Sequence, residues 1–394
     1  MSKKIIVGIT GSIAAYKAVQ LISDLIKMDY HVEVMMSESA ARFITPICIQ
    51  SLTKRKVYVD TFDDENPAII THVDIVKDAD LIMIVPASAH TIAKVAHGFA
   101  DNMLTSAFLA ATCKKLIAPA MNVHMFENPI TQNNIQILKD MGVYFVEPEC
   151  GMLACGDVGK GKLASQEDII EMMHYALCDK PLQGKKILIN AGPTQEAIDP
   201  VRYITNHSSG KMGYAIAKAA FCLGADVTLV SGPTHLKKPY GINVIDIVSA
   251  DDMYNAIIDK TDNYDYMILS AAIGDYSSMH IENEKIKKKD DTLTLSLKKN
   301  KDILYEIGQK KKANQILCGF AMETSDLLVH GKEKLVKKNC DMIVANHLKV
   351  EGAGFQTDTN VVTFITKEAT KDIDLLSKDE LAYKILYTLM DMEA

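Results

Sequence analysis

The sequence predicts an α/β protein of two three-layer domains, and three observations carry this prediction. Near the N-terminus, and again after residue 184, a short apolar strand leads into a glycine-containing turn and a helix. After each opening, apolar runs of strand length alternate with helical stretches, as in a parallel sheet covered by helices on both faces. A polar segment separates the two series, so we expect domains at 1–179 and 180–394.

The first half begins with a βαβ unit. A strand at 5–7 and a turn from Gly8 to Ser12 precede a helix at about 14–28 and a strand at 31–36. Because the crossover between such strands is right-handed, we expect them to be parallel. Apolar residues recur on the helix at Ala15, Ala18, Val19, Ile22 and Ile26. Later strands, and a closing helix N-capped by Ser165, are predicted at 81–85, 116–118, 144–146 and 166–177.

The second half repeats this organisation after a short polar linker at 179–184. A helix from about Met212 ends before Gly224, a residue type preferred just beyond a helix C-terminus. The last helix opens with Ser377 and Glu380 at the spacing of a capping box. Strands are predicted at 185–190, 227–230, 267–270, 316–320, 342–345 and 361–365.

The composition argues against several classes of protein. The net charge is −7, so a general nucleic-acid binder is not expected. No run approaches the roughly 18 consecutive apolar residues of a membrane span, so no membrane partner is expected either. The eight cysteines are scattered without a CxxC pair, which is typical of reduced thiols and favours the cytoplasm.

Two polar turns in the first half follow predicted strands. Gly11 and Ser12 stand where the first strand meets its helix, and backbone amides at a helix N-terminus suit a phosphate group. Ser88 and Thr91 follow the strand at 81–85. Because ligands bind at the carboxyl ends of open parallel sheets, the two turns together indicate one nucleotide site. The first turn lacks GxGxxG spacing, and taken alone it is equally well interpreted as a tight turn without a ligand.

Three further residues of the first half carry reactive or polar groups. His72 precedes a helix, Asn122 follows a strand directly, and Cys155 lies in a glycine-rich stretch. A lone His or Cys is more often structural than catalytic. The glycine-rich setting favours a functional role for Cys155, because a loop of this kind is a poor place for a core thiol.

One segment of the second half has the residue composition of an anion-binding site. Hydroxyls, a glycine and a lysine between Asn206 and Gly213 precede a helix, without the spacing of a Walker A motif. Asp275 follows a strand end, where a carboxylate suits Mg²⁺ bridging phosphates. Lys285 and Lys287–Lys289 form a basic run that, alone, is best interpreted as a solvated hairpin. Its position after the Asp275 strand end favours a triphosphate partner.

Six ordered motifs make residues 4–178 resemble flavin-dependent cysteine decarboxylases, above all phosphopantothenoylcysteine decarboxylase. They are GSIAAYK, the run from Ser37 to Phe43, HVD, PASAHT, PAMN and LACGDVGKG. The resemblance implies a flavodoxin/Rossmann-like domain that binds FMN. The FMN contacts it implies are Gly11, Ser12, Ile13, Ser37, Ser88, Thr91 and Ala120.

The same resemblance implies a chemistry without net redox change. The flavin takes a hydride from the cysteine moiety of the substrate, carbon dioxide leaves, and the hydride returns. In that scheme His72 is the acid–base group beside the reacting thiol, and Asn122 fixes the substrate carboxylate. Cys155 is the proton donor of the final reduction, a role that suits a thiol with a pKa of about 8.5.

Residues 184–390 resemble phosphopantothenate–cysteine ligase, through AGPT, DPVRYITNHSSGKMG, VTLVSGPT, EKIKK, GFxxET and an NxL tail. The resemblance implies a Rossmann-like domain in which phosphopantothenate attacks CTP and cysteine then displaces CMP from an acyl cytidylate. It assigns catalytic roles to Asn206 and Lys285, and Mg²⁺ to Asp275. Further CTP contacts are Ser270, Ala271, Asp302, Ile303, Phe320, Lys334 and Lys338, and departures from the family pattern occur at Gly274, Lys301 and Met322.

Together the two resemblances predict a bifunctional enzyme of coenzyme A biosynthesis that acts on 4'-phosphopantothenate, L-cysteine and CTP. The family builds decarboxylase trimers and ligase dimers, which implies a homo-oligomer and is compatible with a dodecamer. A flavin-binding regulator without catalysis is the alternative, although Asn122 and Cys155 are both present. A pyridine-nucleotide dehydrogenase is disfavoured because neither glycine turn has GxGxxG spacing.

Overall fold

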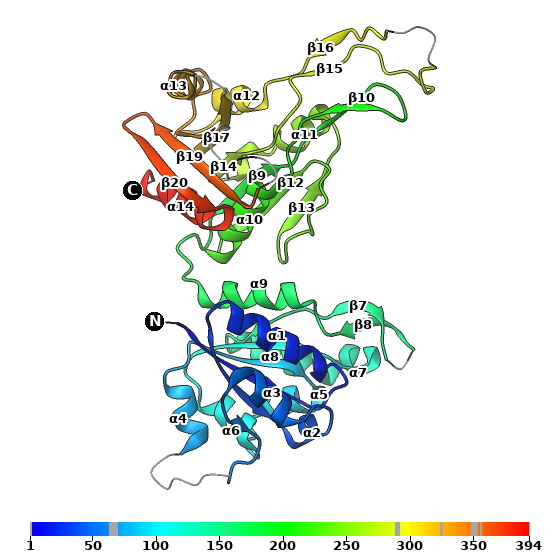
Figure 1. Ribbon diagram of the computed structural model, residues 1–394, viewed down its shortest axis with the longest axis vertical. Coiled ribbons are helices and arrows are strands. Elements are labelled where there is room, and N and C mark those ends of the chain that lie inside the picture. The colour runs from blue at the N-terminus through cyan, green and yellow to red at the C-terminus, as the bar shows by residue number, and fades with distance from the viewer. Residues whose placement is uncertain are drawn as a thin grey trace. The chain divides into compact units, whose positions relative to one another are not determined.

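The computed structural model describes residues 2–62, 70–154, 156–287, 292–323, 326–347, 354 and 357–393. The chain forms two compact units, Met1–Cys178 and Asp179–Ala394, hereafter unit 1 and unit 2 (Figure 1). Each unit contains a central sheet with helices on both faces. The predicted α/β class and the three-layer arrangement are therefore confirmed.

The sheet of unit 1 has six strands in the order β3-β2-β1-β4-β5-β6, and every pairing is parallel, as predicted. This is the strand order of a Rossmann-type doubly wound sheet. Because β1 pairs with β2 on one side and β4 on the other, the connections leaving β1 and β4 cover opposite faces and leave a crevice between them. The strands are β1 Lys4–Ile9, β2 His31–Met36, β3 Val57–Tyr58, β4 Leu81–Ala87, β5 Lys114–Pro119 and β6 Tyr144–Phe145.

The helices of unit 1 bury one apolar stripe each against this sheet. On α1 the buried stripe consists of Ala15, Ala18, Leu21, Ile22 and Leu25. A Ser165 side chain caps the last helix, as predicted. The helices are α1 Ala15–Lys27, α2 Glu38–Ala41, α3 Pro46–Thr53, α4 Thr71–Lys77, α5 Ala89–Ala96, α6 Met103–Ala110, α7 Val123–Glu127, α8 Pro129–Asp140 and α9 Gln166–Leu177.

An antiparallel hairpin, β7 Glu149–Met152 with β8 Val158–Lys162, lies outside the main sheet. The glycine-rich sequence did not predict these strands. Gly161 explains how closely the hairpin approaches the end of β5: its φ is +154°, and a Cβ there would lie 2.4 Å from the Met121 carbonyl oxygen. The Met121 N–H in turn donates to the Gly161 carbonyl at 3.0 Å. The hairpin is thus fixed against the start of α7.

The sheet of unit 2 has eight strands in the order β13-β12-β9-β14-β17-β18-β19-β20. The first six are parallel, as predicted, whereas β19 and β20 are antiparallel to their neighbours. A three-residue connection joins β19 to β20, too short for a parallel crossover. The strands are β9 Lys186–Ala191, β12 Asp226–Ser231, β13 Asn243–Asp246, β14 Tyr266–Leu269, β17 Ile316–Glu323, β18 Met342–His347, β19 Thr359–Thr366 and β20 Thr370–Ser377.

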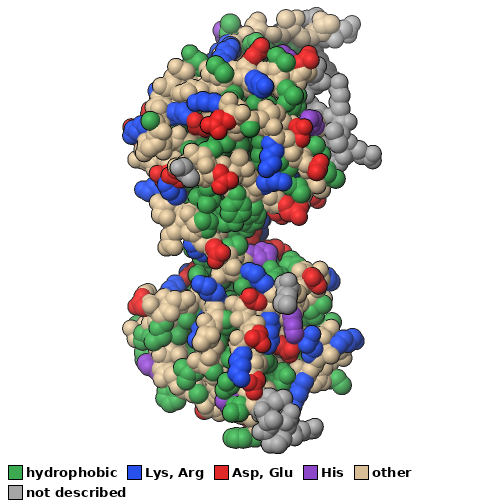
Figure 2. Space-filling view, turned by 90° about the vertical axis from the view of Figure 1, so that its left-hand side faces the viewer, with side chains coloured by type: hydrophobic (Ala, Val, Ile, Leu, Met, Phe, Trp, Pro, Cys, Tyr) green, Lys and Arg blue, Asp and Glu red, His purple; other side chains and the backbone are tan. Residues whose placement is uncertain are grey.

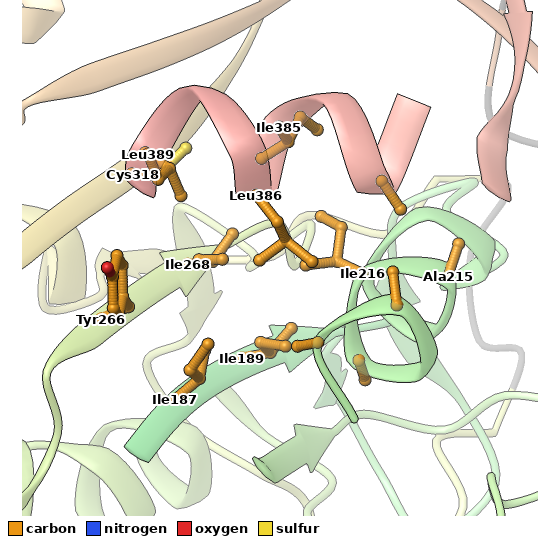
Figure 3. Close-up of a cluster of buried hydrophobic side chains, with 14 of the residues drawn as sticks. Ile187, Ile189, Ala215, Ile216, Tyr266, Ile268, Cys318, Ile385, Leu386 and Leu389 are labelled. Carbon is orange, nitrogen blue, oxygen red and sulfur yellow. The ribbon is translucent and has the colours of Figure 1, made fainter. Parts of the chain in front are cut away.

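Alternating side chains of the unit 2 strands fill two cores. Ile187 and Ile189 of β9 face α10 and α14 (Figure 3), whereas Leu188 belongs to the core on the opposite face. Gly224, with φ +96°, lies just beyond α10, and Ser377 and Glu380 form the predicted capping box of α14. The helices are α10 Lys211–Cys222, α11 Ala250–Ile257, η1 Thr261–Asn263, α12 Ile303–Lys310, α13 Leu327–Lys337 and α14 Lys378–Asp391.

Two small antiparallel pairs extend from unit 2 on the same side of its sheet (Figure 1). They are the hairpin β10 Gln195–Ala197 with β11 Tyr203–Thr205, and the arm β15 Tyr276–Ser278 with β16 Leu297–Lys299.

Among the described residues, none of the helices is long and apolar enough to cross a membrane. On the described face of each unit in Figure 2, acidic and basic side chains are interspersed.

Candidate functional site

A cavity of about 890 Å³ opens at the carboxyl ends of β1, β4 and β5 in unit 1. Its volume is in the range of small-molecule and cofactor sites. The strand order places this crevice where ligands bind in doubly wound sheets. Its lining includes all seven predicted flavin contacts, namely Gly11, Ser12, Ile13, Ser37, Ser88, Thr91 and Ala120.

Two helices of at least eight residues begin at this cavity. The turn from Gly11 leads into α1, and Ser88 caps α5 by accepting a hydrogen bond from the Thr91 N–H at 3.3 Å. The Ser88 and Thr91 hydroxyls also contact each other at 3.2 Å. Helix N-termini carry partial positive charge, and a serine hydroxyl that accepts a backbone hydrogen bond still has its own proton to donate. This wall of the cavity therefore suits a phosphate group.

Thr10 connects the two turns, a role that no sequence motif indicated. It is 1% exposed. Its hydroxyl donates to the Pro86 carbonyl at 2.7 Å and accepts from the Ser88 N–H at 2.9 Å. These partners lie more than seventy positions away in the chain, so only the parallel pairing of β1 with β4 brings them together.

Asn122 also lines the cavity, at the point where β5 passes into α7. Its Oδ1 accepts a hydrogen bond from the His124 N–H at 2.9 Å, and its Nδ2 donates to Asp157 Oδ2 at 2.7 Å. Asp157 belongs to the loop of the β7–β8 hairpin. Asp157 is part of the LACGDVGKG motif, from which no role for it could be predicted, and its carboxylate sets the direction of the Asn122 amide.

Two predicted catalytic residues of unit 1 are placed differently. His72 is half-buried in the first turn of α4 and is not among the residues that line this cavity. Cys155 lies outside the described residues, although its neighbour Ala154 lines the cavity. A single copy of the chain thus gathers Asn122 and the flavin contacts, and His72 lies elsewhere.

The lining of the cavity also contains charged side chains of both signs. Lys94 forms an ion pair with Asp101 across its rim. The Lys94 ammonium holds the pKa of the Asp101 carboxyl below its ordinary value. Lys162 of β8 pairs with Glu149 of β7 at 2.7 Å. Such exposed pairs contribute little to stability.

In unit 2 several predicted nucleotide contacts meet at the ends of β9 and β14. Fully buried Asn190 accepts a hydrogen bond from the Ala271 N–H at 2.8 Å, and the Ser270 hydroxyl donates to the Asn190 carbonyl at 2.6 Å. Asn206 Nδ2 donates to the Ala272 carbonyl at 2.9 Å. Asn190, for which the sequence motifs indicated no role, therefore holds Ser270 and Ala271 together, and Asn206 joins them through the Ala272 carbonyl.

The first turn of α10 rests directly on these strand ends. A Cβ at Gly213 would lie 2.5 Å from the Ala191 Cβ and 2.6 Å from the Ser270 Oγ. Gly210, the N-cap of α10, has φ +79°, a conformation that favours glycine. The glycines thus bring a helix N-terminus close to the carboxyl ends of the sheet, as in nucleotide-binding folds.

A second group of predicted contacts lies where α12 and α13 meet β17. Lys338 forms an ion pair with Asp302, the N-cap of α12, and Ile303 is buried beside it. Lys334 Nζ donates to the Phe320 carbonyl at 2.7 Å. Burial holds the pKa of Lys338 below its ordinary value.

Lys285 lies in the arm, between β15 and β16. It lines a separate cavity of about 620 Å³, and among the residues described there none is another predicted nucleotide contact. Asp275 is exposed at the start of the arm, and its carbonyl accepts from the Asn300 N–H at 2.8 Å. Lys288 and Lys289 of the basic run lie outside the described residues.

No group of three or more His, Cys, Asp or Glu side chains in the described part of the chain is arranged to hold a metal ion. Two of the residues that depart from the family pattern make contacts in the structure. The Gly274 N–H donates to the Thr194 hydroxyl at 2.9 Å. Lys301 Nζ lies 3.9 Å from the centroid of the Tyr254 ring.

Comparison with protein families matches residues 1–177 to the flavoprotein family and 182–392 to the DNA/pantothenate metabolism flavoprotein C-terminal domain. The coenzyme A biosynthesis bifunctional protein CoaBC of Bacillus subtilis (strain 168) is 46% identical over 390 residues, covering 98% of this chain and 96% of that protein. The protein of the same name from Borreliella burgdorferi is 41% identical over 392 residues, covering 98% of this chain and 99% of that protein.

A cysteine/cysteine sulfinic acid decarboxylase from an unknown prokaryotic organism is 44% identical over 356 residues, covering 89% of this chain and 99% of that protein. Among solved structures, the C-terminal domain of a coenzyme A biosynthesis bifunctional protein CoaBC is 41% identical, with a TM-score of 0.47. It covers 54% of this chain and 98% of that one. The FMN-dependent cysteine decarboxylase SpaF is 28% identical, with a TM-score of 0.38, over 43% of this chain and 97% of that one.

Proposed function

The chain belongs to the family of bifunctional coenzyme A biosynthesis proteins, and we propose that each of its two activities resides in one unit. It is a phosphopantothenoylcysteine decarboxylase and a phosphopantothenate–cysteine ligase. Unit 1 carries out the decarboxylation and unit 2 the ligation. The flavoprotein match covers unit 1, and the pantothenate-metabolism match covers unit 2.

The flavin of unit 1 is FMN, and the residues of the 890 Å³ cavity fit it. The Ser12, Ser88 and Thr91 hydroxyls and the N-termini of α1 and α5 hold the phosphate. Ala120, whose N–H donates to the Ala87 carbonyl at 3.0 Å, lines the same cavity with a small side chain that would leave room for the flavin. A bound flavin supplies a reversible hydride acceptor, which lets the substrate lose carbon dioxide without net oxidation.

The side chains around that cavity hold the substrate and handle its protons. Asn122, oriented by Asp157, donates to the departing carboxylate. Cys155, next in the sequence to the cavity-lining Ala154, delivers a proton at the carbon that lost carbon dioxide. His72 takes the proton of the substrate thiol, because an imidazole near neutral pH serves both directions of transfer.

His72 reaches the cavity from a neighbouring copy of the chain. Three observations support this proposal: His72 does not line the cavity of its own copy, Asn122 does, and large apolar side chains are exposed on unit 1. Those side chains include Phe43, Ile47, Phe62, Ile70 and Phe99. We infer trimeric contacts for unit 1 and dimeric contacts for unit 2, which build a dodecamer when combined.

Unit 2 uses CTP to activate 4'-phosphopantothenate. The substrate carboxylate attacks the α-phosphate, pyrophosphate leaves, and the cysteine amine then displaces CMP from the acyl cytidylate. CTP lies across the ends of β9, β14 and β17, and Asn206 holds the intermediate beside Ala272. Lys334 and Lys338, near the end of β17, supply positive charge for the phosphates, and Lys285 joins them from the arm. The exposed Asp275 carboxylate would hold Mg²⁺, which would help to neutralise the phosphate charge of CTP. The scattered cysteines of the chain favour the cytoplasm as the location of the protein.

The observation that carries the proposal is the convergence of Asn122 and seven predicted flavin contacts on one cavity of unit 1, with Asn206, Ser270 and Ala271 converging separately in unit 2. The test uses the full chain with Asn122→Asp or Asn206→Asp. Asn122→Asp should stop carbon dioxide release from supplied phosphopantothenoylcysteine and leave CMP formation intact. Asn206→Asp should show the opposite pattern. Loss of both activities in either variant would refute separate sites.

A further inference from the structure

A buried carboxylate lies in the turn of the β10–β11 hairpin. Asp199 is 3% exposed, and it accepts five hydrogen bonds. Its Oδ1 accepts from the backbone N–H groups of Val201 and Arg202, both at 2.8 Å. Its Oδ2 accepts from Nε and Nη2 of Arg202 at 3.0 and 2.5 Å. The Arg202 guanidinium holds the pKa of Asp199 well below its usual range, so the pair is ionised at neutral pH.

The same ion pair binds both backbone groups of one residue in the arm. The Ile286 N–H donates to Asp199 Oδ2 at 3.1 Å, and Arg202 Nη2 donates to the Ile286 carbonyl at 3.1 Å. A nearby backbone bond, from the Glu282 N–H to the Ile198 carbonyl at 3.0 Å, joins the same two segments. A planar guanidinium presents several donors in a fixed geometry, which a lysine cannot reproduce. Ile286 directly follows Lys285.

The hairpin that carries this pair is also attached to the nucleotide site. Its second strand ends at Thr205, and the next residue, Asn206, donates to the Ala272 carbonyl at 2.9 Å. The Thr205 hydroxyl donates to the Thr194 carbonyl at 2.8 Å, which anchors the strand beside β9. The hairpin therefore connects Asn206 at its base with the Lys285 segment at its turn. In Figure 1, β10 and the arm lie on the same side of the sheet.

We propose that the Asp199–Arg202 ion pair is a positioning element of the ligase. By holding Ile286, it fixes the backbone of Lys285 to the hairpin that ends at Asn206, so that the lysine ammonium is presented to phosphate without reordering the arm. This inference rests on the proposed function, because the role of Lys285 belongs to it. Asp199 and Arg202 act through Lys285 and contact neither CTP nor cysteine.

The first test compares carboxylate-to-amide changes in the full-length chain. Asp199→Asn keeps the shape of the side chain but removes the charge that holds Arg202 and turns an acceptor into a donor. Its ligase kcat should fall about ten- to hundredfold, because small misplacements of a catalytic group cost that much. Asp374→Asn, on the exposed edge strand β20, is the matched control and should retain ligase activity within about twofold. Decarboxylation of supplied phosphopantothenoylcysteine reports that the chain is folded.

The second test distinguishes positioning from general stabilisation of the arm. If Asp199 acts through Lys285, then Asp199→Asn should lower activity little further in a Lys285→Ala background, because the two changes remove one interaction. The inference would be overturned if the two substitutions reduced ligase activity by the product of their separate effects. It would also be overturned if Asp199→Asn kept the ligase activity of the unmodified chain. If Lys285→Ala activity lies below detection, Lys285→Arg replaces it in the cycle. Full ligase activity of Lys285→Ala would instead refute the proposed role of that lysine.

Limited trypsin digestion reports whether the arm is held in place, independently of ligase activity. Cleavage after Lys287 should be at least about tenfold faster in Asp199→Asn than in the unmodified chain, because Ile286 has lost its anchor. Cleavage after Lys260, an exposed lysine between α11 and η1, should not change. Arg202→Lys, which keeps the charge but not the planar fork, should behave like Asp199→Asn. Equal cleavage after Lys287 in all these chains would overturn the inference.

Discussion

At the scale of single residues, each site is organised by a buried polar side chain whose hydrogen-bond partners lie far away in the sequence. Thr10 in unit 1 and Asn190 in unit 2 each follow or end the first strand of their sheet, and each bonds to a loop about eighty positions away. Both were missing from the sequence-based site, because a sequence shows the residue type and not its partner. The residues predicted from motifs, such as Ser88 and Ala271, are the ones these groups hold in place.

Thr10→Val tests this organisation in unit 1. Valine fills the same space but leaves the Ser88 N–H and the Pro86 carbonyl without their hydroxyl partner, at a cost of about 1–3 kcal/mol. FMN affinity should fall roughly tenfold or more, whereas Thr10→Ser, which keeps the hydroxyl, should stay near the unmodified chain. Titration of flavin fluorescence with apoprotein measures both. An unchanged Kd for Thr10→Val would show that the bridge does not shape the flavin site.

At the scale of elements, periodicity predicted most of the strands and helices but not the finer features. On α1 the sequence placed Ile26 on the buried stripe, yet Ile26 is 37% exposed and Leu25 is buried instead. Two apolar neighbours can satisfy the same helical spacing, and only packing decides between them. The β7–β8 hairpin escaped prediction because its glycines carry little strand propensity. Its position depends on contact with Met121, far away in the sequence.

Gly161→Ala tests the attachment of that hairpin. The new Cβ would lie 2.4 Å from the Met121 carbonyl at a backbone φ of +154°, so the hairpin must shift away from the start of α7. Decarboxylation should fall at least about tenfold, with ligation unchanged. Gly151→Ala is the control on the same hairpin, because its Cβ would meet only Lys162 at an ordinary 3.6 Å. Equal decarboxylase rates for the two variants would contradict the attachment.

The N-terminus of α14 makes a pH-dependent contribution to unit 2. Lys378 is buried there, donates to the Gly354 and Thr357 carbonyls at 3.0 and 2.6 Å, and burial lowers its pKa to about 8. An unfolded lysine titrates near 10.4. Between about pH 8 and pH 10 the unfolded chain therefore binds more protons at this position, so Lys378 makes stability rise with pH in that window.

Lys378→Met isolates this contribution. Urea unfolding of both chains between pH 7.5 and 10 should show the unmodified chain gaining stability relative to Lys378→Met as the pH rises. The difference removes the titration of other lysines, tyrosines and cysteines common to both chains. A difference that is constant, or that falls with pH, would contradict a lowered pKa for Lys378.

At the scale of the whole molecule, each unit has its own sheet and its own buried clusters. The sequence indicated two domains because the strand–turn–helix opening occurs twice. It did not indicate the antiparallel β19–β20 edge of unit 2, since short connections rather than residue type decide the direction of those strands. The sequence also could not predict that His72 lies outside the cavity of its own copy, because hydrophobic periodicity carries no information about which side chains share a cavity.

Separate fragments test the independence of the units. Residues 1–179 should fold, bind FMN and decarboxylate phosphopantothenoylcysteine, and residues 182–394 should form it from 4'-phosphopantothenate, L-cysteine and CTP. Thermal unfolding of each fragment should be cooperative. Two fragments that are both insoluble or inactive, under conditions where the full chain works, would mean that each unit needs the other.

The most direct measurement of the central claim follows one carbon atom through both reactions. The full chain, supplied with FMN, Mg²⁺, CTP, 4'-phosphopantothenate and cysteine labelled with ¹³C in its carboxyl group, should release ¹³CO₂ and 4'-phosphopantetheine in equal amounts, with one CMP formed for each. Omission of CTP should stop all three products, and supplied phosphopantothenoylcysteine should restore carbon dioxide release without CMP. Release of ¹³CO₂ from cysteine in the absence of CTP and phosphopantothenate, or formation of CMP without any ¹³CO₂, would contradict a chain that first ligates and then decarboxylates.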